Sequence, residues 1–178
     1  MKTRTVLITQ AAVIAAAYIV LTLPFAQFAF GPIQLRLAEA LTVLPILTPA
    51  AVPGLFIGCL LANTLNPAPL GLIDIVFGSL ASLAAGWLTW RLGRRVRERN
   101  LPVASLPTLI ALLPPILING LVVGFYLPFI LPDIDPSPAV IAVTMLSIAA
   151  SQAVVIFAVG APLLAGIRKT GVLRLGKD

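Results

Sequence analysis

The chain has 178 residues, of which 60% are hydrophobic and 10% are charged, and its mean hydropathy is +1.08. A soluble domain cannot bury that much apolar surface, so the composition indicates an integral membrane protein. The absence of His and the single Cys, Cys59, exclude an intrachain disulfide and a metal site built from Cys and His. The net charge is +6. In a membrane protein such an excess of Lys and Arg indicates how the chain is oriented in the bilayer, and we expect no nucleic-acid partner.

The apolar runs predict one all-α transmembrane domain over residues 1–178, embedded in a lipid bilayer. Several runs approach or exceed the roughly 20 residues that span a bilayer as a helix. Six helices are expected, over residues 5–23, 35–48, 51–65, 70–92, 104–128 and 139–167. The second and third are short because prolines interrupt the apolar sequence around them.

The first expected helix carries small residues at helical spacing. Lys2 and Arg4 precede it, but its apolar run is long for a signal peptide and no clear cleavage site follows, so we expect it to be retained. Pro24 is expected to end it, and residues 25–34 to form an aromatic loop. Two uses of the small residues stay open, namely packing inside this chain and docking of another membrane subunit. These residues are Ala11, Ala12, Ala15 and Ala16.

Basic residues predict the orientation of the chain. The segment 91–99 contains five arginines, and both ends of the chain are also basic. Lys and Arg collect on the cytoplasmic side of membrane proteins, so we place all three regions in the cytoplasm. Four helices before the arginine segment and two after it satisfy this condition. The prediction is therefore a multi-pass protein of the plasma membrane with six spans and both termini cytoplasmic.

With this orientation, the polar residues within or directly beside the expected helices gather in the outer half of the membrane. They are Gln34, Arg36, Glu39, Asn63, Asn66, Asp74 and Asn119, with Gln152 near the middle of the last helix. Ionisable groups at such depth usually pair or bind something. A channel would need polar groups at both depths, so the one-sided cluster favours capture of a small molecule from outside.

Each of these residues also has a purely structural explanation. Arg36 and Glu39 are three positions apart and could form an ion pair, or Arg36 could anchor at lipid headgroups. Asp74 could cap the start of its helix. The amide residues could join helices by hydrogen bonds.

Carboxylates accept hydrogen bonds and amides both donate and accept them, which suits a flat heterocycle with several N–H groups and carbonyls. Aromatic rings that could stack on such a ligand are those of Tyr126, Phe125, Phe30 and Phe28.

The chain resembles the QueT family of queuosine-precursor transporters. The resemblance is carried by Gln-Leu-Arg-Leu-Ala-Glu-Ala-Leu at 34–41, by Gly54, Gly58 and Asn63, by Asp-Ile-Val-Phe-Gly-Ser-Leu-Ala at 74–81, by Pro-Pro-Ile-Leu-Ile-Asn-Gly at 114–120 and by Gly-Ala-Pro-Leu at 160–163. It implies a six-helix substrate-binding (S) component of an energy-coupling-factor (ECF) transporter. Such a component works with a transmembrane coupling subunit and two ATPase subunits. It is not an enzyme, and ATP is used by the partners.

The resemblance also implies the ligand, a 7-deazaguanine such as 7-aminomethyl-7-deazaguanine. Glu39 and Asp74 would hold its guanine-like N–H edge and its aminomethyl cation, and Asn63 and Asn119 would read the carbonyl and ring nitrogens. Relatives often have Glu at the position of Gln152 and an acidic residue near Tyr126. The uncharged residues here leave 7-cyano-7-deazaguanine and queuine as alternatives. Arg36 completes the expected site.

Four other functions stay open from the sequence. One is an S component for a vitamin or another purine. A second is a stand-alone channel or secondary carrier, which would need no ATPase partner. A third is an intramembrane enzyme, although no base lies beside a nucleophile. The last is a structural membrane subunit that binds no small molecule.

Overall fold

The computed structural model describes residues 2–29, 34–67, 70–132 and 134–170. Within these residues the protein is all helical, without a strand. The elements in chain order are α1 (Lys2–Thr22), η1 (Leu23–Phe25), α2 (Ala26–Ala29), η2 (Leu37–Ile46), α3 (Ala51–Leu65), η3 (Asp74–Gly78), α4 (Ser79–Leu92), α5 (Arg94–Arg99), α6 (Leu106–Ala111), α7 (Leu113–Ile118), η4 (Asn119–Val123), α8 (Gly124–Ile130), α9 (Pro138–Val155), η5 (Ile156–Gly160) and α10 (Ala161–Thr170). Several follow one another without a break and form longer continuous helices.

Four of these continuous helices are long and apolar enough to cross a membrane: Arg4–Phe25, Asp74–Leu92, Leu106–Ile130 and Pro138–Thr170. Two shorter apolar helices, Leu37–Ile46 and Ala51–Leu65, lie between the first and second of them. The described part of the chain is therefore a helical membrane protein with four candidate spans. The ends of most helices differ by a few residues from those expected.

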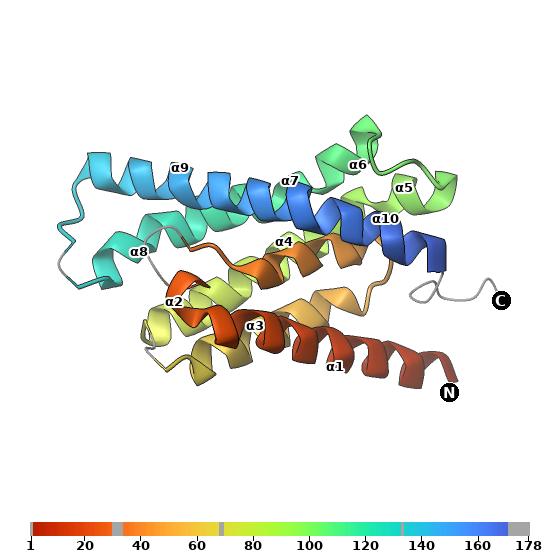
Figure 1. The fold of residues 1–178 in the computed structure, drawn as a ribbon, viewed down its shortest axis with the longest axis horizontal. Helices are drawn as coiled ribbons and strands as arrows, with labels where there is room; N and C mark the ends of the chain where they lie inside the picture. Colours follow the sequence, from red (N-terminus) through yellow and green to blue (C-terminus); the bar gives the residue numbers. More distant parts are fainter. Residues whose placement is uncertain (1, 30–33, 68–69, 133, 171–178) are drawn as a thin grey trace.

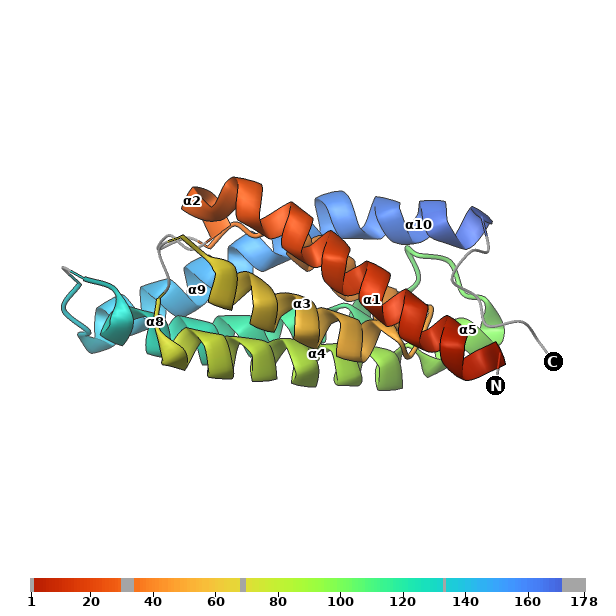
Figure 2. The same ribbon diagram turned by 90° about the horizontal axis from the view of Figure 1, so that it is seen from below.

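The helices run along one another in an elongated bundle with two distinct ends (Figures 1 and 2). The start of α1, the short helix α5 and the end of α10 lie at one end in both views. The connection between α8 and α9 lies at the opposite end. The basic residues of α5 and α10 are thus gathered at one end of the bundle, which we call the basic end.

The α-helix α1 ends at Thr22, one residue before the predicted end at Leu23, but the chain keeps a helical path through Pro24. Pro24 is the second residue of η1, a single tight turn, and α2 continues the helical path to Ala29. A proline in the first turn of a helix loses no hydrogen bond, because the N–H groups of that turn have no partner within the helix. Part of the expected aromatic loop is therefore helical.

The second expected helix is shorter and tighter than residues 35–48. It covers Leu37–Ile46 in three-residue turns, and all of its residues from Ala38 to Ile46 are buried. A helix that is apolar all round must be covered by neighbours. η2 packs against α1, α4 and η5, so it forms the centre of the bundle and carries Glu39 into the interior.

The arginine-rich helix α5 is fastened to the end of η2. Arg97 donates through Nη1 to the carbonyl oxygens of Pro45 (3.1 Å) and Ile46 (3.3 Å), and through Nη2 to the carbonyl of Trp90 (2.9 Å). Its guanidinium also lies 5.6 Å from the centre of the Trp90 ring. Burial lowers the pKa of Arg97 from its ordinary value. By contrast, Arg94 and Glu98 form an exposed pair, and the hydrogen bond from Arg94 lowers the pKa of Glu98.

Close packing between α1 and α3 depends on two glycines of α3. A Cβ atom on Gly54 would lie 2.8 Å from the carbonyl oxygen of Ala11. A Cβ on Gly58 would lie 2.7 Å from the Cβ of Tyr18 and 3.1 Å from the carbonyl oxygen of Ala15. Small residues allow such backbone approach in membrane proteins.

This packing divides the small-residue face of α1 into a part that packs within the chain and a part that is exposed. Ala15 is 6% exposed and Ala11 is half-buried, so both pack within the chain. Ala12 and Ala16 are exposed. The part of the predicted docking face that is accessible consists of these two residues.

We predict that Gly58→Ala lowers the thermal stability of the protein in detergent. The added methyl group collides with α1, and overpacking of a tight contact costs about 1–3 kcal/mol. Gly166→Ala is the control, since a Cβ there meets no atom within 4 Å. Circular dichroism melts of the two variants would test this packing. Equal melting temperatures would contradict it.

Candidate functional site

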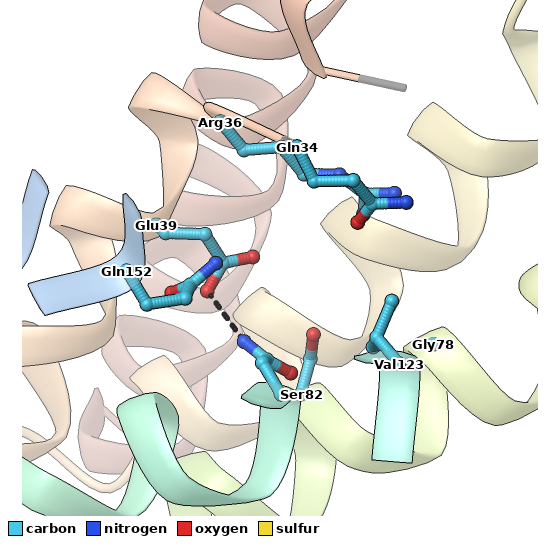
Figure 3. A pocket seen from close by; sticks show the side chains of 8 residues that line it. Gln34, Arg36, Glu39, Gly78, Ser82, Val123 and Gln152 are labelled. Carbon is cyan, nitrogen blue, oxygen red and sulfur yellow. Dashed lines mark hydrogen bonds between the residues drawn. The ribbon is translucent and has the colours of Figure 1, made fainter. Parts of the chain in front are cut away.

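A small cavity lies inside the bundle, where five segments meet (Figure 3). It is lined by Gln34, Arg36, Glu39, Gly78, Ser82, Asn119, Val123 and Gln152. Its volume is about 10 Å³, close to the space that one water molecule needs. In the described structure the cavity therefore has room for about one water molecule and not for a larger ligand.

Two wide helical turns place polar residues beside the cavity. η3 begins at Asp74 and ends at Gly78, and η4 begins at Asn119 and ends at Val123. Both segments have the π-helical geometry that often marks functional sites. They contact each other, so the wide turns of two different spans meet at one level of the bundle.

Glu39 is the carboxylate that lines the cavity, and it is 2% exposed. The Tyr18 hydroxyl donates to its Oε1 (2.5 Å), and Asn119 Nδ2 donates to its Oε2 (3.2 Å; Figure 3). Both described donors to Glu39, a hydroxyl and an amide, are uncharged groups. A buried carboxylate is costly unless its charge is met, so a ligand that brings N–H donors or a positive charge would stabilise this site.

Arg36 pairs with Asp74 and not with Glu39. Its Nη2 lies 3.7 Å from Asp74 Oδ2, and its Nη1 donates to Asn63 Oδ1 (3.2 Å). Asn63 Nδ2 donates to the Asp74 carbonyl (3.0 Å), and the Tyr126 hydroxyl donates to Asp74 Oδ1 (2.7 Å). These four residues form one buried network, which we call the arginine network. The ion pair of Arg36 in the structure is therefore with Asp74, and not the local pair with Glu39 that the spacing had left open.

The structure divides the predicted binding residues into two groups. Arg36, Glu39, Asn119 and Gln152 line the cavity. The remaining three residues of the arginine network do not line it, because their polar groups are turned to one another: Asn63, Asp74 and Tyr126. In this structure these three residues hydrogen-bond within the network that holds Arg36, and their direct contact with a ligand stays a prediction.

Gly78 separates the two groups. A Cβ atom on Gly78 would lie 3.1 Å from Asn63 Nδ2 and 3.2 Å from the Tyr126 hydroxyl. Since Gly78 also lines the cavity, the arginine network lies directly behind this wall.

Two polar residues of the site are absent from the prediction, Tyr18 and Ser82, and a third, Gln34, was placed in the outer polar cluster but not among the binding residues. Tyr18 is fully buried on α1, and a lone tyrosine among aliphatic residues was the available signal. Gln34 lies two positions before Arg36, and its side chain lines the cavity. Ser82 is one helical turn after Gly78 on α4, so it faces the same way.

The predicted stacking rings receive little support. Phe125 is 55% exposed, and its ring packs 5.7 Å from that of Phe129, outside the cavity. Phe30 and the side chain of Phe28 fall outside the described part of the chain. Tyr126 has its ring 6.5 Å from Phe77 and uses its hydroxyl in the arginine network.

Among the described residues, no group of three or more His, Cys, Asp and Glu side chains is placed to hold a metal ion. The groups that face the cavity are amides, a hydroxyl, a guanidinium and a carboxylate. Such a set is suited to recognition of a polar heterocycle by hydrogen bonds.

The model of the family described as "QueT transporter" matches residues 8–169 of this chain. The match covers both wide turns, both basic helices and all residues of the site. Comparison with curated proteins and with solved structures gave no significant match.

We predict that Tyr126→Phe destabilises the protein without removing an aromatic ring. The change leaves Asp74 with one donor fewer in a buried network, and a hydrogen bond to a charged group contributes about 1.5–3 kcal/mol. Thr64→Ala serves as the control, because the Thr64 hydroxyl is exposed and bonds only within its own helix. Thermal unfolding in detergent measures both variants. If Tyr126→Phe melts with the wild type, the network does not hold these helices together.

Proposed function

This chain belongs to the QueT transporter family, and from that premise we propose that it binds a queuosine precursor, a 7-deazaguanine, and takes part in its uptake. We propose further that it is the S component of an ECF importer in the plasma membrane. The observation that carries the ligand class is the buried Glu39 carboxylate, which lines the cavity and receives hydrogen bonds from neutral donors.

The chemistry of a 7-deazaguanine fits this carboxylate. Its ring N–H and exocyclic amine lie side by side, and a carboxylate accepts from both at once. Each oxygen of Glu39 has one donor in the described structure and has further acceptor capacity. The cavity is smaller than a purine, so binding requires its walls to move apart.

The number of carboxylates at the cavity indicates which 7-deazaguanine, cationic or neutral, should bind. Glu39 is the carboxylate that lines the cavity, whereas Asp74 is engaged by Arg36. If Glu39 holds the guanine-like edge, the described site offers no second carboxylate for an aminomethyl cation. We therefore expect 7-cyano-7-deazaguanine to bind at least as tightly as the 7-aminomethyl form.

The basic end of the bundle supports the proposed orientation. Arg97, Arg168 and the other basic residues of α5 and α10 lie there, and we place that end in the cytoplasm. Counting the short helices η2 and α3 as spans gives six, with both termini cytoplasmic. Asp74 and Tyr126 then lie toward the outer side, which suits capture from outside.

The exposed side of α1 supports docking of a transmembrane coupling subunit, which in turn binds two ATPase subunits. Ala12 and Ala16 are exposed there, and Val13 beside them is 62% exposed. A largely apolar groove of about 640 Å³ adjoins this face, between α1, η2 and the end of α10. A membrane partner with small residues of its own could approach this surface closely.

We predict that Glu39→Gln weakens 7-deazaguanine binding by about 10–100-fold. The substitution removes the charge of the acceptor, and hydrogen bonds to charged groups contribute about 1.5–3 kcal/mol. Calorimetry on the purified protein would measure the affinity, with guanine and riboflavin as competing ligands. Glu98→Gln is the matched control, because Glu98 is exposed on α5.

An unchanged affinity in Glu39→Gln would remove Glu39 from the site. Failure of the wild type to bind any 7-deazaguanine would remove the cargo and direct the search to vitamins and other purines. Uptake by the chain alone, without ATPase partners, would instead support a stand-alone carrier.

We predict that the double substitution Ala12→Trp and Ala16→Trp prevents assembly with the coupling subunit and leaves ligand binding unchanged. Two large rings on this face hold a partner helix away, while neither residue contacts the cavity. Leu146→Trp is the control, because Leu146 is 71% exposed on α9. Co-purification with the coupling subunit and calorimetry give the two readouts. Normal assembly of the double variant would place the docking surface elsewhere.

A further inference from the structure

Two buried amides that face the cavity each have an atom without a partner. Gln34 Nε2 and Gln152 Oε1 have no hydrogen bond to any described residue, although Gln34 is 3% and Gln152 is 4% exposed. Both side chains line the cavity together with Glu39 (Figure 3). The great majority of buried polar atoms are hydrogen-bonded, so an unused donor and an unused acceptor in one cavity require an explanation.

The backbone holds these two amides close to each other. Ser151, the neighbour of Gln152 on α9, donates its hydroxyl to the carbonyl oxygen of Gln34 (3.4 Å). The same carbonyl accepts from the backbone N–H of Arg36 (3.1 Å). The backbone carbonyl of Gln34 is thus hydrogen-bonded to Arg36, directly before η2, and to Ser151 on α9, next to Gln152.

Gln34 also has an unusual backbone conformation. Its φ of +47° lies in the left-handed region, which residues other than glycine rarely adopt. Such strain is found at functional sites, where the surrounding structure imposes it. Here it accompanies a side chain whose amide is buried in the cavity.

We propose that Gln34 and Gln152 act as a donor–acceptor pair for the ligand. Gln34 donates its free N–H to the ligand carbonyl, and Gln152 accepts from a ring N–H. This inference rests on the proposed function, because a 7-deazaguanine carries both groups. Together with Glu39, the pair gives the site one charged acceptor, one neutral acceptor and one donor, which distinguishes a guanine-like ring from an adenine-like one.

The same substitution at the two positions tests the pair, since the proposal gives the two residues opposite roles. Gln34→Glu replaces the donor by an acceptor that faces the ligand carbonyl, and we expect a loss of affinity of at least roughly tenfold. Gln152→Glu keeps the acceptor, and we expect affinity to be retained or increased, most for the 7-aminomethyl form. Calorimetry with the 7-cyano and 7-aminomethyl ligands measures both. Equal losses, or a retained affinity in Gln34→Glu, overturn the assignment.

A second measurement does not depend on the ligand. Gln34→Met and Gln152→Met remove the unpartnered atoms but keep the length of the side chain. We expect the ligand-free melting temperature to stay the same or rise, whereas Asn119→Leu, which removes a donor to Glu39, lowers it. Met variants as unstable as Asn119→Leu would show that the amides are structural. If the wild type binds no 7-deazaguanine, the proposed ligand class is wrong. The melting temperatures of the Met variants then still test whether the two amides contribute to the stability of the ligand-free protein.

Discussion

The burial of the Arg36 guanidinium is the constraint around which this bundle is arranged. A guanidinium inside a membrane protein must have both its charge and its N–H groups met by other parts of the chain. Here the partners come from α2, from α3, from η3 and, through Asp74, from α8. One side chain at the start of the short central helix therefore links four other segments, and it also lines the cavity.

The buried polar residues form two groups, the arginine network and Glu39 with its hydrogen-bond donors. Arg36 and Asp74 neutralise each other, and their neighbours complete the hydrogen bonds. Glu39 accepts hydrogen bonds from a hydroxyl and an amide in the described structure, and the ion pair of Arg36 is with Asp74. The Arg36–Asp74 pair joins helices, and the Glu39 carboxylate lines the cavity where a ligand could bind.

Much of this organisation follows from the residues alone. The membrane class follows from hydropathy, and family membership follows from the Arg-x-x-Glu and Asp-x-x-Phe-Gly segments. The partner of Arg36 could not be predicted, because spacing along a helix suggests Glu39 whereas tertiary packing brings in Asp74. The hydrogen bond of Tyr18 to Glu39 could not be predicted either, because a tyrosine in an apolar helix can lie at a lipid interface as well as form a buried hydrogen bond. The helical path through Pro24 could not be predicted, because the cost of a proline depends on its place within a turn.

The central position of η2 has a consequence for biosynthesis. A helix of ten residues that contains a buried glutamate and follows a buried arginine is too short and too polar to reside alone in a lipid bilayer. Asn119 follows Glu39 by 80 positions, so the ribosome must complete most of the chain before this carboxylate meets its second donor. Until then Tyr18 on α1 is the described donor that is already available to Glu39. The hydrogen bonds of this buried carboxylate are therefore completed only when the fifth hydrophobic segment packs against the second.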